Sequence, residues 1–257
     1  MNIQDALERY ASIPELSSFK NPLFVGPHPD DIEFGCGALI SKMKEMGATI
    51  HFLIVTDGSA GTIDPLTPPE KLKEIRYEES RNAANYLGIQ TLDFMNFDDG
   101  GLYEVEDVTR EVSKYILKYL PDIIFTVDPN LRTECHADHL KTGEGVRRAT
   151  QVVGYPEILK RHGIDIGEST QYPRNIYLAY YFSDEPNTYT QVSPKNLNDK
   201  ITALMCHKSQ MQGENALLLE YFKYKAMIDG KMANKELAES FMVIPPMLQH
   251  VFSQKLN

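Results

Sequence analysis

Five short apolar runs, separated by longer segments with helical periodicity, constrain the fold of this chain more than any other feature. The runs have the length of strands and lie at about 22–27, 49–55, 91–96, 122–127 and 175–182. Between them, apolar residues recur at helical spacing, and Gly47, Gly88 and Pro121 stand where helices end. Such alternation is typical of an α/β protein with a doubly wound, mostly parallel sheet. We therefore predict a Rossmann-like fold with strand order 3-2-1-4-5.

The length of the chain, 257 residues, suits one large domain of this class. We expect a single domain, 1–257, whose core covers about 20–182. A C-terminal helical extension with a closing segment covers about 196–257, and a short amphipathic helix is expected at 2–12. Within the extension, residues 211–238 are polar and helical in propensity, and the sequence assigns them no role.

The composition excludes several classes of partner. The net charge is -10 and no basic block occurs, which argues against binding to nucleic acid or to an anionic membrane. The three cysteines, Cys36, Cys135 and Cys206, form no CxxC motif and indicate reduced thiols in a cytosolic protein. The N-terminus lacks the features of a signal peptide, and no apolar run is long enough to span a membrane. We expect a soluble cytoplasmic protein.

Two polar clusters follow the first and fourth predicted strands. One is His28-Pro29-Asp30-Asp31 and the other is His136-Ala137-Asp138-His139. In the predicted strand order these two strands are neighbours, and the chain leaves them toward opposite faces of the sheet. That arrangement creates a crevice at the carboxyl ends of the strands. The topology therefore predicts that the two clusters lie side by side.

The residue types in these clusters suit a catalytic metal site. His28, Asp31 and His139 can hold one zinc ion, or another divalent metal, and leave a coordination position open for water. Asp30 is the candidate general base, since adjacent aspartates point in different directions and the zinc lowers the pKa of the water. Asp138 is expected to orient a ligand histidine. Metal ligands and a base together indicate hydrolysis.

Other readings of the same residues remain open. Asp30 and Asp31 could both cap the helix that starts near residue 32, and Cys135 is a competing ligand. His136 shares a helix face with His139, three residues on. As a fourth ligand it would close the site, so we expect it to donate to the developing oxyanion or to the leaving amine.

Together with further short motifs, these clusters resemble the zinc-dependent de-N-acetylases of the PIG-L, or LmbE-like, superfamily. The resemblance covers most of the chain, and it is greatest to the diacetylchitobiose deacetylase branch. The motifs that carry it besides the two clusters are Thr56-Asp57-Gly58 with Gly61-Thr62, Arg76 with Glu78-Glu79, Leu87-Gly88, Asp98-Asp99 with Leu102, Asp128-Pro129, His207-Lys208-Ser209-Gln210, and the segment from Phe241 to His250.

The resemblance implies more than the residues do alone. It implies that His250 helps to stabilise the oxyanion and that Arg76 and Asp99 contact the sugar. It also implies an N-acetylated amino-sugar substrate and a homo-oligomer, either a trimer or a hexamer. Ala137 stands where this superfamily usually has proline, which alters the stiffness of the loop more than its chemistry.

The sequence supports one leading function and two alternatives. The leading hypothesis is the removal of the N-acetyl group from N-acetylglucosamine, diacetylchitobiose or a conjugate of N-acetylglucosamine by metal-activated water. A metal-dependent phosphoester hydrolase would favour two metals and a richer ligand set. A catalytically inactive sugar-binding protein would have no need of Asp30 or His136.

Overall fold

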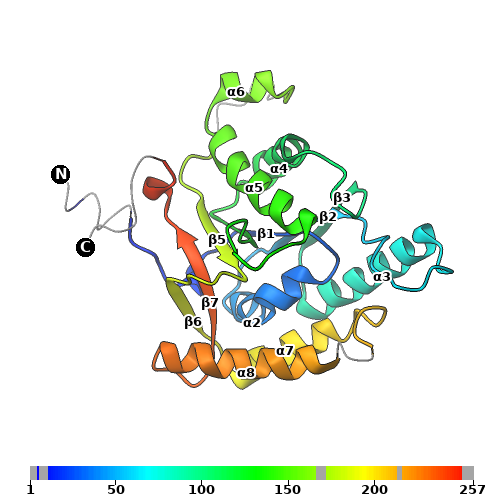
Figure 1. Cartoon of the computed structure of the whole chain (residues 1–257). Coiled ribbons are helices and arrows are strands. Elements are labelled where there is room, and N and C mark those ends of the chain that lie inside the picture. Colours follow the sequence, from blue (N-terminus) through cyan, green and yellow to red (C-terminus); the bar gives the residue numbers. More distant parts are fainter. Residues whose placement is uncertain (1–4, 6–10, 166–171, 213–215, 251–257) are drawn as a thin grey trace.

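The computed structural model describes residues 5, 11–165, 172–212 and 216–250 (Figure 1). Its seven-stranded sheet has the order β3-β2-β1-β4-β5-β7-β6, which confirms the predicted 3-2-1-4-5 core. The strands are β1 (Pro22–Gly26), β2 (His51–Thr56), β3 (Thr91–Phe97), β4 (Ile123–Val127), β5 (Tyr177–Tyr181), β6 (Thr188–Gln191) and β7 (Ala238–Ile244). All residues of β1, β2 and β4 are buried, as expected for parallel strands covered on both faces.

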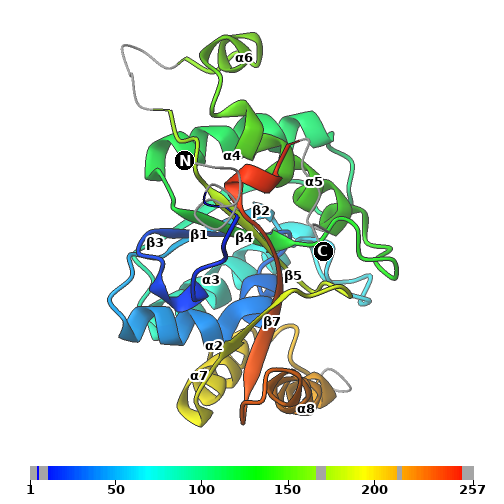
Figure 2. The same cartoon turned by 90° about the vertical axis from the view of Figure 1, so that its left-hand side faces the viewer.

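Helices cover both faces of the sheet (Figures 1 and 2). They are α2 (Asp31–Glu45), α3 (Pro69–Leu87), α4 (Val105–Tyr119), α5 (Ala137–Val152), α6 (Pro156–Arg161), α7 (Pro194–Leu204) and α8 (Ala216–Met232), with 3-10 turns η1 (Leu16–Ser18) and η3 (Pro246–Leu248). One apolar cluster joins the sheet to α2, α3 and α7. A second cluster joins the opposite face to α4 and α5.

The positions of β1 and β4 create the expected switch point. β1 pairs in parallel with β2 on one side and with β4 on the other. The chain leaves β1 into α2, beneath the sheet in Figure 1, and leaves β4 into α5, above it. The carboxyl ends of β1 and β4 therefore meet at one edge, with the first residues of α2 and α5 beside them.

The C-terminal part departs from a simple parallel sheet. β7 runs antiparallel to β5, and β6 runs antiparallel to β7. The short helix α6 lies between α5 and β5, and Pro156 at its first position favours helix initiation there. The division into a core of 20–182 and an extension of 196–257 stays a prediction, although β7 completes the same sheet.

The helix expected at 2–12 lies largely outside the described residues. Among the helices of the described part, none combines the length and the apolar character needed to cross a membrane.

Candidate metal centre

Three ligand atoms converge at the carboxyl edge of β1 and β4. His28 follows β1, Asp31 is the first residue of α2, and His139 lies in the first turn of α5. The Oδ2 atom of Asp31 is 3.1 Å from Nδ1 of His28 and 3.4 Å from Nε2 of His139. The structure thus brings together the three residues that the sequence proposed as ligands.

This donor set fits zinc. Zinc binds imidazole nitrogens and carboxylate oxygens at about 2.0–2.1 Å, so two ligands of a tetrahedral ion stand about 3.3 Å apart. The spacings around Asp31 agree with that value. The group also attracts positive charge: burial alone lowers the pKa of His28, but Asp138, Asp31 and Asp99 raise it to about 12.

Neighbouring carboxylates lie beside the outer ring nitrogens of both histidines. Oδ2 of Asp138 lies 3.3 Å from Nε2 of His28 and accepts a hydrogen bond from the backbone N–H of Gly100. Oε2 of Glu134 lies 2.8 Å from Nδ1 of His139. Each carboxylate therefore leaves the other ring nitrogen facing Asp31, as in many zinc sites. The sequence suggested this arrangement for Asp138 but not for Glu134, since a lone glutamate in a loop carries no distinguishing signal.

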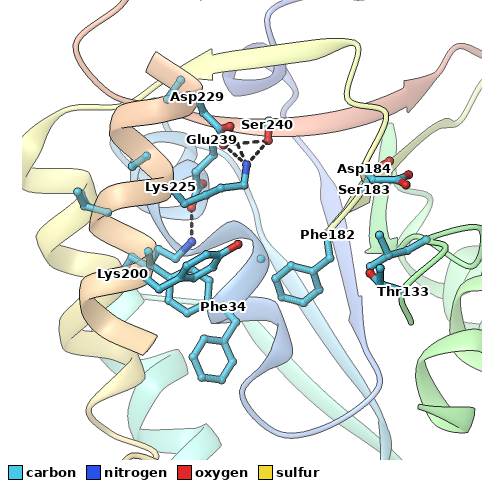
Figure 3. A pocket seen from close by; sticks show the side chains of 17 residues that line it. Phe34, Thr133, Phe182, Ser183, Asp184, Lys200, Lys225, Asp229, Glu239 and Ser240 are labelled. Atoms are coloured by element: carbon cyan, nitrogen blue, oxygen red, sulfur yellow. Dashed lines mark hydrogen bonds and ion pairs between the residues drawn. The ribbon is translucent and has the colours of Figure 1, made fainter. Parts of the chain in front are cut away.

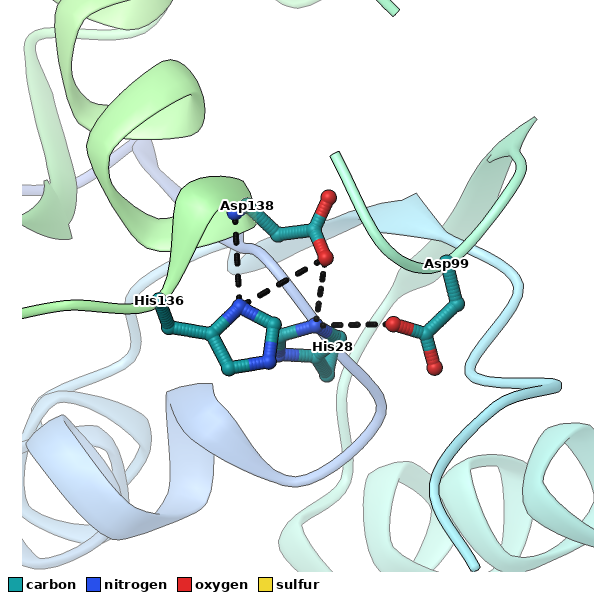
Figure 4. Close-up of side chains that lie close together, drawn as sticks. All are labelled: His28, Asp99, His136 and Asp138. Atoms are coloured by element: carbon teal, nitrogen blue, oxygen red, sulfur yellow. Dashed lines mark hydrogen bonds and ion pairs between the residues drawn. The ribbon is translucent and has the colours of Figure 1, made fainter. Parts of the chain in front are cut away.

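A second group of possible ligands shares His28. It consists of His28, Asp99, His136 and Asp138 (Figure 4). Nε2 of His28 lies 3.3 Å from a carboxylate oxygen of both aspartates. If Nδ1 of His28 binds a metal, Nε2 carries its proton and donates to Asp138, so the second group is better read as support for the first.

Asp30 is buried next to the three ligands. It has a backbone φ of 122° and ψ of -27°, which is unusual for a residue other than glycine. Its Oδ2 atom lies 3.3 Å from Nη2 of Arg76. Burial raises the pKa of Asp30 to about 6, with Arg76 opposing and Asp31 reinforcing the shift. A carboxyl group with that pKa suits proton transfer near neutral pH.

Arg76 is buried beside the candidate base, Asp30. Its side chain is only 4% exposed. The guanidinium donates to the carbonyl oxygens of Pro29 (2.8 Å) and Gly58 (3.1 Å) as well as to Asp30. A guanidinium enclosed in this way has little surface left for a sugar, so its geometry supports positioning of Asp30. A charge on a long helix is usually solvated, which is why this contact could not be predicted from the sequence.

Two further candidate residues, Asp99 and His136, lie beside His28. Asp99 lies at the site, where one carboxylate oxygen faces His28 and the other accepts from the backbone N–H of Ala60. The side chain of His136 is 49% exposed, and its ring centroid is 4.6 Å from that of His28. A donor to a bound substrate needs this combination of access and proximity.

His250 is not brought to the site. Because β7 is antiparallel to β5, the chain after Ile244 continues away from the edge of the sheet that carries the candidate site. The side chain of Gln249, one residue before His250, donates to the carbonyl of Ile176, at the opposite end of β5. The fold-back over the crevice that the oxyanion role requires is therefore absent from the described residues.

Fold and site together define a class of protein: a doubly wound α/β protein with a His/Asp/His cluster that could hold a metal ion, and a buried carboxylate, at the switch point. The family profile described as GlcNAc-PI de-N-acetylase, or PIG-L, matches residues 23–150. A diacetylchitobiose deacetylase from Thermococcus kodakarensis is 30% identical over 237 residues, covering 90% of this chain and 86% of that protein. The chain belongs to the PIG-L family.

Solved structures agree with this assignment. N,N'-diacetylchitobiose deacetylase from Pyrococcus horikoshii superposes with a TM-score of 0.85 at 26% identity, covering 99% of this chain and 97% of that one. GalB, a 4-carboxy-2-hydroxymuconate hydratase from Pseudomonas putida, reaches a TM-score of 0.70 at 19% identity, covering 93% and 100%. The fold thus also occurs in a hydratase, so the reaction must be argued from the site.

Proposed function

We propose that this chain is a zinc-dependent hydrolase that removes the N-acetyl group from an N-acetylglucosamine-type sugar. The observation that carries the proposal is a buried carboxyl group, Asp30, with a raised pKa beside three converging metal-ligand atoms. Membership of a family of de-N-acetylases supports the same reaction, and relatives named as diacetylchitobiose deacetylases point to N-acetylglucosamine, diacetylchitobiose or a related conjugate.

The residues of the site divide the work of amide hydrolysis. His28, Asp31 and His139 would hold the ion, which supplies Lewis-acid activation of water and of the acetyl carbonyl when bound. Asp30 accepts a proton from the attacking water and returns it to the amine as the C–N bond breaks. Arg76 holds Asp30 in place.

Two further residues act on the substrate in this proposal. The exposed imidazole of His136 donates to the oxygen of the acetyl group as negative charge develops there. Asp99, at the same edge, accepts hydrogen bonds from hydroxyl groups of the sugar. One of its carboxylate oxygens already accepts a hydrogen bond from the backbone N–H of Ala60.

The alternatives have less support. The two groups of possible ligands share His28, so they do not form the independent pair of metal sites that a two-metal phosphoester hydrolase favours. An inactive sugar-binding protein would not need Asp30 in a strained, buried position.

The test is to load the purified protein with zinc and measure free amine released from N-acetylglucosamine, diacetylchitobiose and N-acetylglucosaminyl malate. Asp30→Asn is the matched variant, because it removes the base without changing its size. It should retain the metal and lose about 10²–10⁴-fold in kcat. Absence of amine from all three substrates, or near-normal turnover of Asp30→Asn, would contradict the proposal.

The trimer or hexamer implied by the resemblance, and the cytoplasmic location, remain predictions. Sedimentation of the purified protein would test the first, and cell fractionation the second.

A further inference from the structure

A pocket of about 320 Å³ is lined in part by residues that neighbour the candidate metal centre in the sequence. Its walls come from α2, α7, α8, the start of β7 and the loops that follow β4 and β5 (Figure 3). None of the proposed metal ligands lines it. Two of its residues continue from the site, however: Phe34 lies one helical turn after Asp30 on α2, and Thr133 directly precedes Glu134.

The inner wall of the pocket is aromatic. The ring centroids of Phe34 and Phe222 are 5.1 Å apart, and those of Phe222 and Tyr221 are 5.3 Å apart. Phe182 faces them from the loop after β5 (Figure 3). The negative faces of such rings attract C–H groups and other aromatic rings.

Four of the charged groups that line the pocket are paired with one another, and Asp184 is paired with Arg132 outside it. Lys200 and Glu239 are 2.7 Å apart, with side chains 5% and 6% exposed. Nζ of Lys225 lies 2.6 Å from both carboxylate oxygens of Asp229 and 2.9 Å from the hydroxyl of Ser240. A charged ligand entering here would lose its hydration and find its possible partners already engaged. The pocket therefore suits an uncharged ligand.

Resting on the function proposed above, we propose that this pocket binds the part of the substrate beyond the N-acetylated sugar: an uncharged group with an apolar face. Residues three apart share a helix face, so Phe34 extends the face of α2 that begins with the candidate ligand Asp31. A group attached to a sugar at the centre has this aromatic wall as its neighbour. In this proposal α8, to which the sequence assigns no role, contributes to the choice of substrate.

The test compares the specificity constant kcat/KM on substrates with and without such a group. Phenyl N-acetyl-β-glucosaminide offers an aromatic group, diacetylchitobiose offers a second sugar ring, and N-acetylglucosamine offers neither. Tyr221→Ala removes an aromatic ring that lines the pocket. Tyr224→Ala is the matched control, since Tyr224 lies on the same helix, is likewise exposed and is not part of the pocket.

In Tyr221→Ala, the ratio of kcat/KM for an extended substrate to that for N-acetylglucosamine should fall about 2- to 12-fold, the scale of one aromatic contact. In Tyr224→Ala the ratio should match that of the unaltered protein. A fall for the phenyl glycoside alone assigns the pocket to an apolar aglycone, and a fall for diacetylchitobiose alone assigns it to a second sugar. An unchanged ratio for both substrates in Tyr221→Ala and in Phe222→Leu overturns the proposal.

Failure of the proposed function would be visible separately, as an unaltered protein that releases amine from no substrate. In that case, calorimetric titration of the phenyl glycoside decides the matter. Binding that weakens in Tyr221→Ala but not in Tyr224→Ala supports the pocket, and equal affinities or no binding refute it.

Discussion

Replacing Arg76 with methionine tests the link between the buried guanidinium and the proposed base, Asp30. Methionine keeps most of the apolar stem of the side chain and removes the charge. The variant loses the contact with Asp30 at 3.3 Å and the hydrogen bonds to the carbonyls of Pro29 and Gly58 at 2.8 and 3.1 Å.

The structure sets the size of the effect. Removing one partner of a buried ion pair costs about 3–5 kcal/mol, because the other charge stays buried without compensation. Arg81→Met is the matched control on the same helix. The side chain of Arg81 is 53% exposed and its ion pair with Glu78 spans 3.5 Å, so its loss should change the free energy of unfolding by about 0.5 kcal/mol or less.

Urea denaturation of both variants measures the difference in their free energies of unfolding. A chelator is present so that metal binding does not contribute. Turnover provides a second readout: a base displaced by about 1 Å can cost on the order of 100-fold in rate, while the metal content of the zinc-loaded protein stays at the level of the unaltered chain. The free energies of unfolding of Arg76→Met and Arg81→Met could instead lie within about 1 kcal/mol of each other, with normal turnover in both. In that case Arg76 does not hold Asp30 in place.

Three further substitutions separate the roles proposed at the metal centre. His139→Ala removes one of three ligands, so elemental analysis should find well below one metal per chain, and undiminished stoichiometry would exclude His139 as a ligand. Asp138→Asn weakens the orientation of His28 and should lower metal affinity about 10- to 100-fold in a chelator competition; equal affinity would leave Asp138 without that role. His136→Ala should lower kcat by about 100-fold or more with KM and metal content little changed, and a change confined to KM would instead indicate ground-state binding.

Much of the metal centre could be predicted because it follows from topology. The apolar runs before His28 and His139 identify β1 and β4, and parallel strands bring their carboxyl ends to one edge of the sheet. No knowledge of side-chain packing is needed for that step. The ligand set could therefore be proposed from the order of elements together with the chemistry of histidine and aspartate.

The features that the sequence could not supply depend on long-range contacts. The run Phe241-Met242-Val243-Ile244 indicates a strand but gives neither its neighbour nor its direction, and its antiparallel pairing with β5 is what separates His250 from the site. Arg76 is buried because the loop through Gly58 closes over it. That glycine has a φ of 66°, and a Cβ there would stand 2.9 Å from the guanidinium.

The backbone conformation of Asp30 lowers the stability of the protein, while the side chain of Asp30 is needed for the proposed activity. A residue with a side chain in this left-handed region of φ costs on the order of 1–3 kcal/mol, a strain that glycine would not feel. In a chain selected for stability alone, glycine would be the better residue at this position. The strained turn instead directs a carboxylate toward Arg76, and any variant that relaxes the turn by removing the side chain also removes the proposed base.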